Sequence, residues 1–231
     1  NAPDVEQSRI TGMNHWQVVL ALEYAAALEE WIGEAEFARR NRRLQHQLAT
    51  RGIETFWVAE RGLFADDRGH TRFSEHTQCL ALLSKTLPET QRTTLATTLF
   101  TSPDLTRMTI SLTHYLFEVC AFLDRPDILL ERLDVWYELL ARGLYTTIEA
   151  PEPNRSDCHG WGTHPLYHQF ATLLGIRPAE MGFRSVIIHP RFGPLERLSG
   201  KMVHPAGFIV ADLLRNGEHL TGSIELPPGV T

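Results

Sequence analysis

Cysteine is scarce in this sequence of 231 residues, which contains only Cys79, Cys120 and Cys158. No two of them form a Cys-x-x-Cys pair, and an odd number of widely spaced cysteines indicates neither a disulfide framework nor a zinc knuckle. Unpaired thiols favour a reducing compartment, so a cytoplasmic location is the expectation. The sequence begins at Asn1 without an initiator methionine, and N-terminal signals that would change this expectation can precede it.

Long apolar runs and the motifs of several common enzyme classes are absent as well. No run approaches the ~18 apolar residues of a membrane-spanning helix. The sequence contains no Gly-rich phosphate loop, no His-Glu-x-x-His zinc motif and no Gly-x-Ser-x-Gly elbow of a serine hydrolase. Its 22 basic and 28 acidic side chains are mixed along the chain and give a formal net charge of -6. Because a nucleic-acid surface needs clustered basic residues, we expect neither a nucleic-acid partner nor a membrane partner.

What the sequence does contain is a long series of helical periodicities. Apolar residues at helical spacing, with capping residues before them and glycines after them, predict seven helices at about 14–31, 34–56, 74–83, 88–100, 108–123, 127–142 and 165–175. Asn14 is the expected N-cap of the first helix, with Gln17 in the capping-box position. Residues 57–72 interrupt the series and indicate a short hairpin.

After residue 175 the hydrophobic period changes from that of helices to that of strands. Strand-like runs are expected at 184–189, 198–203, 207–214 and 221–226. Asn216-Gly217 lies between the last two runs, and Asn-Gly is the strongest short signal for a β-hairpin. The expected fold class is therefore mainly α with a C-terminal β module, in which helical hairpins precede a small antiparallel sheet.

The stretch from Thr146 to Pro165 is the richest in side chains that can do chemistry. It contains Glu149, Glu152 and Asp157, and these carboxylates are followed by His159, Trp161 and His164. A sugar site needs such a combination, because hydroxyl groups require hydrogen-bonding partners and the C–H face of a sugar packs on an aromatic ring. The alternative is that the acids are ordinary solvated loop residues.

Two other groups of polar residues allow both a structural and a functional interpretation. His164 and His168 are four residues apart on one predicted helix face, but no third ligand stands at a suitable spacing, so we expect no metal ion and no cofactor. Ser74 and Glu75 are suited to the N-terminus of the third helix as capping and dipole-stabilising residues. Alternatively, Glu75 or His76 lies at the mouth of a cavity.

Several segments of the sequence resemble bacterial α-L-rhamnosidases of glycoside hydrolase family 78. The resemblance is carried mainly by GLYTTIE at 143–149 and RSDCHGWGTHPLY at 155–167. SEHTQCLALL at 74–83 is similar to a helix start in that family, and LGIRP at 174–178 is similar to its junction into a C-terminal β-sandwich. The resemblance covers nearly all of the chain from about Gly12.

The resemblance implies a fold, a reaction and a set of site residues. The fold would be about half of an (α/α)6 toroid at 1–178, followed by part of an antiparallel β-sandwich at 179–231. The enzyme would release terminal α-L-rhamnose from rhamnose-containing carbohydrates with inversion, using one carboxylic acid and one carboxylate base. The family's base corresponds to Glu149, with Glu152 as second choice. His159 and Trp161 would contact the sugar, and Asp157 and His76 are the other expected sugar-binding residues.

One departure from the family pattern limits what this chain can do. The family's general acid lies in an Asp-Glu-Arg stretch followed by Gly-Trp, and no such stretch occurs here. We therefore expect a fragment of a longer enzyme, inactive without its proton donor, whose exposed apolar helix faces pair in a homodimer. The rival interpretations are a non-catalytic carbohydrate-binding or scaffold protein on the same fold and an all-helical interaction module.

Overall fold

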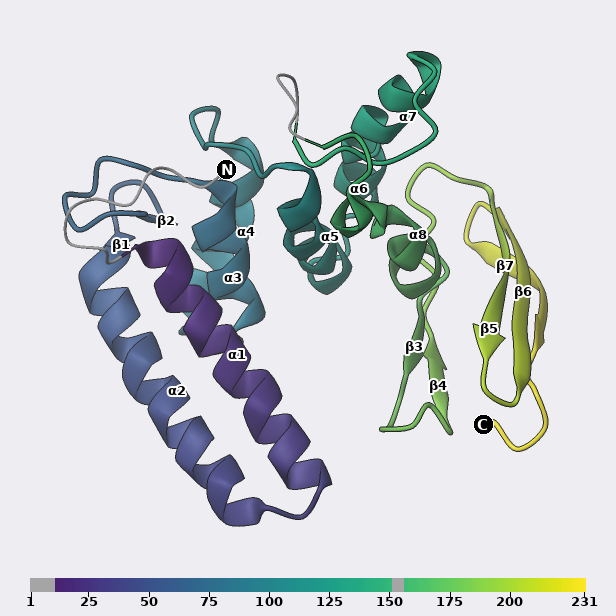
Figure 1. Cartoon of the computed structure of the whole chain (residues 1–231), viewed down its shortest axis with the longest axis horizontal. Helices are drawn as coiled ribbons and strands as arrows, with labels where there is room; N and C mark the ends of the chain where they lie inside the picture. The colour runs from purple at the N-terminus through teal and green to yellow at the C-terminus, as the bar shows by residue number, and fades with distance from the viewer. Residues whose placement is uncertain (1–10, 151–155) are drawn as a thin grey trace. The chain divides into compact units, whose positions relative to one another are not determined.

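A computed structural model describes residues 11–150 and 156–231 of the chain (Figure 1). The chain divides into two compact units, Asn1–Val119 and Cys120–Thr231. The expected boundary at residue 178 concerns the domains of the complete protein and stays a prediction.

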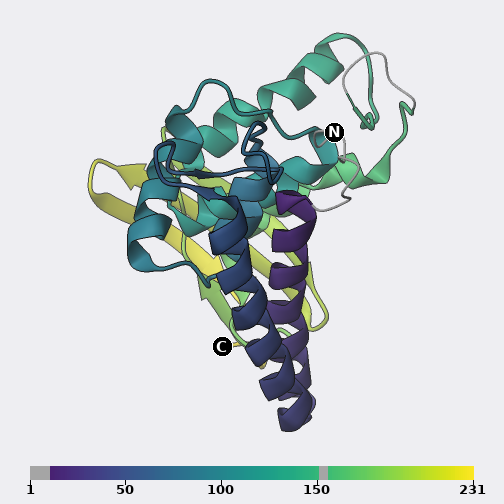
Figure 2. The same cartoon turned by 90° about the vertical axis from the view of Figure 1, so that its left-hand side faces the viewer.

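The N-terminal unit is built on a long antiparallel helical hairpin. Helices α1 (Gly12–Trp31) and α2 (Ala35–Phe56) run side by side in both views (Figures 1 and 2). Their shared core contains Trp16 and Phe56, both almost completely buried. Because a hairpin of two helices can bury only one face of each, residues of the distal half of α1 remain about half exposed: Tyr24 59%, Leu28 50% and Trp31 58%.

The first helix begins earlier than the sequence predicted. Thr11, not Asn14, is the N-cap, and the Thr11 hydroxyl accepts a hydrogen bond from the Asn14 amide at 3.2 Å. Asn14 thereby becomes the third residue of the helix, where its amide needs such a partner. The prediction of Asn14 as the cap was therefore wrong.

The rest of the N-terminal unit follows the predicted order of elements. Strands β1 (Trp57–Val58) and β2 (Leu63–Phe64) form the expected short antiparallel hairpin. Helices α3 (Glu75–Leu83) and α4 (Glu89–Thr101) follow it. A 3₁₀ turn then leads into α5 (Thr113–Phe122). In α5 the side chains of Leu116, Phe117 and Val119 are buried.

The C-terminal unit starts with two short helices where the sequence predicted one. Helix α6 (Pro126–Arg132) has proline in its first turn, and α7 (Asp134–Ala141) follows after Leu133. The Leu133 amide still donates to the carbonyls of Leu129 and Leu130. The interruption is therefore a local tightening of the helix, with the Leu133 backbone still helical.

Residues 142–150 and 156–159 lie between α7 and the last helical segment, which the sheets follow. The helical segment consists of a 3₁₀ turn (Gly160–Thr163), α8 (Pro165–His168) and a π-helical turn (Gln169–Leu173). Strands β3 (Ile176–Pro178) and β4 (Val186–Ile188) form one antiparallel hairpin. The β3 strand was not predicted, because three residues ending in proline are too short to show a strand period.

The final three strands form an antiparallel sheet in the order β5-β6-β7. They are β5 (Arg197–His204), β6 (Gly207–Asn216) and β7 (His219–Glu225). The predicted Asn216-Gly217 turn joins the last two, and Asn216 pairs with His219. Alternate residues of β6, namely Ile209, Ala211 and Leu213, are buried on one face of the sheet. The prediction of a mainly helical chain with a C-terminal antiparallel β module is confirmed.

None of the helices described in the structure is both long enough and apolar enough to cross a membrane.

Candidate active site

The loop that carries most of the predicted site residues is held closed by hydrogen bonds between its two arms. One arm is Thr146–Glu149 and the other is Ser156–His159. The His159 amide donates to the Thr147 carbonyl at 2.7 Å, and the Glu149 amide donates to the Ser156 carbonyl at 2.9 Å. The Thr147 hydroxyl donates to the His159 carbonyl at 2.6 Å, and the Thr146 hydroxyl donates to the Asp157 carbonyl. We call these four hydrogen bonds the loop clasp.

The loop clasp brings three of the predicted site residues close together in space. Glu149 and His159 are both half-buried, whereas Asp157 is exposed. Ile148, directly before Glu149, is 5% exposed and anchors the first arm. Glu152, the second choice for the base, lies outside the described residues.

Trp161 is the predicted residue best placed to offer an open aromatic face. Its side chain is 78% exposed, and its ring stands edge-on to that of His159 with centroids 5.8 Å apart. The turn below it is fixed, because the Trp136 indole N–H donates to the Gly162 carbonyl at 2.7 Å. An exposed ring on a fixed turn beside an imidazole and carboxylates can pack against a sugar and bind its hydroxyl groups.

His164 and His168, at the start of the last helical segment, both contact other side chains of the C-terminal unit. The rings of His164 and His168 are 5.7 Å apart, and His164 also contacts Trp136 edge-on. His168 is completely buried, and its Nδ1 atom shares a hydrogen bond with the Thr172 hydroxyl at 2.9 Å. The Thr172 hydroxyl therefore satisfies one nitrogen of the buried His168 ring.

The polar sequence at the start of α3 is buried throughout. Ser74 was expected to cap the helix, but no side-chain cap forms, and its hydroxyl donates to Asp66 at 2.8 Å. The buried Asp66 carboxylate accepts this hydroxyl and that of Thr77. The Glu75 carboxylate accepts the Met108 amide at 2.7 Å. These bonds tie α3 to the neighbouring loops.

His76 differs from its neighbours in α3. Its side chain is 1% exposed, and neither ring nitrogen has a hydrogen-bond partner among the described residues. Burial in this surrounding disfavours the imidazolium and lowers the pKa of His76 to about 4, although Glu75 opposes the effect. His76 is thus a neutral buried imidazole in the N-terminal unit, whereas Glu149, Asp157, His159 and Trp161 belong to the C-terminal unit.

The lowered pKa of His76 predicts a pH-dependent loss of stability. Between the ordinary pKa of 6.5 and about 4 the unfolded chain binds a proton that the folded chain does not, so the free energy of unfolding falls as the pH falls through this window. The total loss is about 3 kcal/mol. The His76→Leu variant should lack this loss when its denaturant unfolding is compared with wild type between pH 7 and pH 4.

Burial raises the pKa of Asp66, so protonation of Asp66 increases the free energy of unfolding as the pH falls, which is opposite to the effect of His76. The wild type must therefore be compared with His76→Leu at each pH. The ionised Asp66 carboxylate lowers the free energy of unfolding. This loss is regained as the pH falls, to the same extent in wild type and in His76→Leu. Replacement of the exposed His189 by glutamine is the matched control. A wild-type curve parallel to that of His76→Leu would contradict the prediction.

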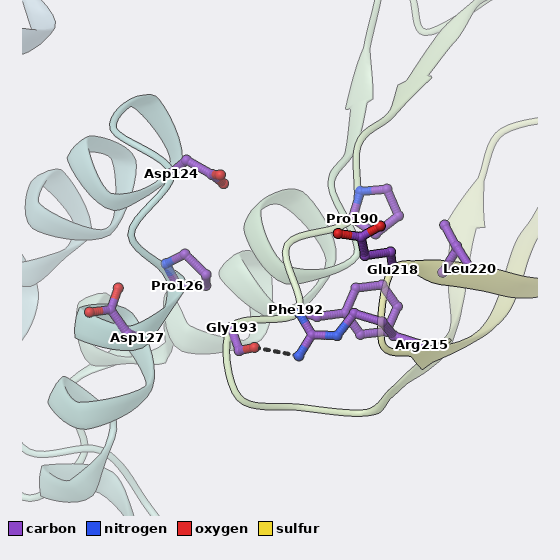
Figure 3. A pocket seen from close by; sticks show the side chains of 9 residues that line it. All are labelled: Asp124, Pro126, Asp127, Pro190, Phe192, Gly193, Arg215, Glu218 and Leu220. Atoms are coloured by element: carbon purple, nitrogen blue, oxygen red, sulfur yellow. Dashed lines mark hydrogen bonds between the residues drawn. The ribbon is translucent and has the colours of Figure 1, made fainter.

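A cavity that the sequence did not reveal lies in the C-terminal unit (Figure 3). Its volume is about 500 Å³. Two of its acidic groups are already compensated: Asp124 pairs with Arg191 at 3.2 Å, and Asp127 pairs with Arg125 at 2.7 Å. Glu218 is the third acidic residue of the lining. The Arg215 guanidinium lies over the Phe192 ring and donates to the Gly193 carbonyl at 2.7 Å, as Figure 3 shows. We therefore place the candidate active site at the loop.

A second hollow of about 500 Å³ begins directly after the loop and follows the last helical segment. Most of its walls are apolar. Leu166, Tyr167, Phe170, Phe183 and Met202 line it. The Arg177 guanidinium lies 6.0 Å from the centre of the Tyr167 ring and donates to the Ala171 carbonyl. These residues come from a helix, a hairpin and a strand, so no local pattern in the sequence points to the hollow.

The fold and the C-terminal residues match known rhamnosidases. Residues 175–231 match the family described as "Bacterial alpha-L-rhamnosidase C-terminal domain". The GH78 family rhamnosidase of Bacillus sp. GL1 aligns with 98% of this chain and 26% of its own length, with a TM-score of 0.83 and 20% identity. No curated protein sequence matches the chain.

Two further solved structures have the same fold. The α-L-rhamnosidase of Streptomyces avermitilis, in complex with L-rhamnose, aligns with 92% of this chain and 22% of its own length, with a TM-score of 0.75 and 17% identity. The α-L-rhamnosidase of Aspergillus terreus aligns with 92% of this chain and 26% of its own, with a TM-score of 0.73 and 20% identity.

These similarities concern the fold of nearly the whole chain and the sequence of its residues 175–231. The chain has the fold found in these α-L-rhamnosidases. Its residues 175–231 are similar to the C-terminal domain of the bacterial enzymes. The resemblance inferred from the sequence is confirmed at this level. The chain spans about a quarter of the length of the rhamnosidases named here.

Proposed function

We propose that the loop from Thr146 to Pro165 forms one side of the active site of an inverting glycoside hydrolase. The enzyme releases terminal α-L-rhamnose from rhamnose-containing carbohydrates. The observation that carries the proposal is the loop clasp, which holds Glu149 and His159 together on a fold shared with rhamnosidases. As a sugar contact, the buried His76 stays a prediction.

Glu149 is the proposed general base. In an inverting reaction the base removes a proton from water as the water oxygen attacks the anomeric carbon. At the same time a carboxylic acid protonates the glycosidic oxygen, which leaves with the bonding electron pair. The half-buried position of Glu149 leaves its carboxylate access to water while its backbone amide is held by Ser156.

The proton donor is the part of this mechanism that these residues do not supply. The two carboxyl groups of an inverting enzyme are about 6.5–9.5 Å apart, with the attacking water beside the base. The Asp-Glu-Arg stretch that holds the acid in the family does not occur in the 231 residues. We therefore propose that the complete protein is active and that this chain alone is not, because the leaving group would lack its proton.

The sugar itself is proposed to contact the second arm of the loop and the turn after it. Trp161 offers the stacking ring, His159 a hydrogen-bonding imidazole, and Asp157 a carboxylate that can accept sugar hydroxyls. The solved rhamnosidase of Streptomyces avermitilis contains L-rhamnose, which supports rhamnose as the sugar.

The stereochemical outcome tests the proposed reaction class. When the full-length protein hydrolyses an aryl α-L-rhamnoside, proton NMR in the first minutes should show β-L-rhamnose, which then mutarotates. The physical reason is that water attacks opposite to the leaving group in a single displacement. Initial formation of the α anomer would contradict the inverting mechanism.

A carbohydrate-binding protein without catalysis is the second candidate. The exposed Trp161 ring beside His159 favours it, because stacking and hydrogen bonding suffice for binding. Glycan binding by the full-length protein without any release of rhamnose would support this candidate over the enzyme.

The distal part of α1 predicts self-association of the 231-residue chain. Leu28 and Trp31 are at least half exposed and lie on one helix face, and such apolar faces form protein interfaces. We propose a homodimer through this face. Light scattering at high concentration should detect the dimer in wild type and a monomer in the double variant Leu28→Lys/Trp31→Lys. Glu36→Lys, which makes the same change in charge on the exposed side of α2, should stay dimeric.

A further inference from the structure

One residue of the loop clasp, Thr147, connects the two arms through both its backbone and its side chain. Thr147 holds His159 at two points: its carbonyl accepts the His159 amide at 2.7 Å, and its hydroxyl donates to the His159 carbonyl at 2.6 Å. The next link between the arms is the Glu149 amide to the Ser156 carbonyl. Thr147 and His159 are 12 residues apart in sequence, so this clamp closes the loop.

The two links between the arms are separated by different numbers of residues on the two arms. Between them, the first arm advances two residues, from Thr147 to Glu149, while the second advances three, from Ser156 to His159. Neither arm is a strand among the described residues, but an extra residue on one of two paired segments redirects the side chain that follows it, as it does in a β-bulge. A slip of one residue in this pairing would therefore change the direction of the His159 side chain. The two-point clamp prevents that slip.

We propose that Thr147 is a positioning residue, whose hydroxyl sets the spacing between the base Glu149 and the sugar-contacting His159. This inference rests on the proposed function, because it assigns Thr147 a part in the same reaction. The hydroxyl acts on Glu149 and His159 and does not itself touch the reacting atoms.

The clamp can be opened without leaving a buried carbonyl unpaired. In Thr147→Val the side chain keeps its branching and volume and loses only the donor. The His159 carbonyl still accepts the Gly162 amide at 3.0 Å, and the His159 and Glu149 amides keep their acceptors. The variant should therefore fold, and its defect should lie in the geometry of the loop.

Steady-state kinetics of the full-length protein on an aryl α-L-rhamnoside provide the first readout. Thr147→Val should lower kcat by about 10- to 100-fold, since a displacement of about 1 Å at a catalytic group has effects of this size. Thr147→Ser keeps the hydroxyl and should restore kcat. Thr101→Val is the matched control, because the Thr101 hydroxyl also donates to a backbone carbonyl, that of Thr97 in α4 at 3.0 Å, far along the chain from the loop.

Amide hydrogen exchange of the 231-residue chain is the second readout and needs no activity. The Glu149 and His159 amides should be protected in wild type and should exchange at least about tenfold faster in Thr147→Val. Wild-type kcat in Thr147→Val, or an equal defect in Thr147→Ser, would overturn the positioning role. Retained turnover in Glu149→Gln would instead overturn the proposed function, so the two failures are distinguishable.

Discussion

Replacement of Glu149 by glutamine is expected to lower the kcat of the full-length protein on α-L-rhamnosides by about 10²- to 10⁴-fold. Glutamine has nearly the same shape as glutamate, so the backbone bond from residue 149 to the Ser156 carbonyl is kept. The amide cannot remove a proton from the attacking water. The affinity for rhamnose, measured by calorimetry on the inactive variant, should stay close to that of wild type, because the base acts in the transition state.

Two other variants make this result specific. Glu152→Gln tests the second choice for the base, and Glu180→Gln removes an acid outside the loop that accepts the Ser185 hydroxyl. Both should keep wild-type turnover. Full activity in Glu149→Gln together with loss in Glu152→Gln would move the role of base to Glu152.

Replacement of Gly175 by alanine is expected to destabilise the C-terminal unit by at least about 4 kcal/mol, a large part of the stability of an ordinary domain. Gly175 has a φ of 69°, which L-residues adopt at a cost of about 1–2 kcal/mol. A Cβ atom there would lie 1.9 Å from the His189 carbonyl oxygen and 2.3 Å from its carbon. Because both obstacles are backbone atoms of the residue directly after strand β4, neither can rotate away.

The matched control for this prediction is Gly182→Ala. Gly182 has a φ of 82°, and a Cβ atom there would meet nothing within 4 Å. This variant should lose only the cost of the backbone conformation, about 1 kcal/mol. Denaturant unfolding followed by circular dichroism measures both. Equal stability of the two variants would contradict the steric argument.

The elements of the fold could be predicted where one local signal was strong. Helix α2 and the turn at Asn216-Gly217 were found because the apolar period and the turn residues are contiguous in sequence. The cap at Thr11 and the interruption at Leu133 were missed. In both cases several arrangements of the same backbone were locally acceptable, and the surrounding packing selected one of them.

The residues of the candidate site were proposed from the sequence, whereas the hydrogen bonds between them could not be. Glu149, His159 and Trp161 stood out by their chemical types and by resemblance to a known family. The hydrogen bonds of the loop clasp join residues 7 to 12 positions apart, and their acceptors are backbone carbonyls that every residue possesses. Nothing in the identity of Thr147 shows which carbonyl its hydroxyl will reach.

The sequence by itself determined the mainly helical chain with a C-terminal β module, the resemblance to rhamnosidases, and the residue types that a sugar site requires. The hydrophobic period, the turn residues and the motifs are properties of residues that are neighbours in the chain, so they can be recognised in the sequence alone. Only the tertiary structure decided that His76 is buried, that Ser74 bonds Asp66 instead of capping its helix, and that Gly175 faces the His189 backbone. Burial and steric contact depend on segments that are distant in sequence and close in space, and that proximity is created by folding.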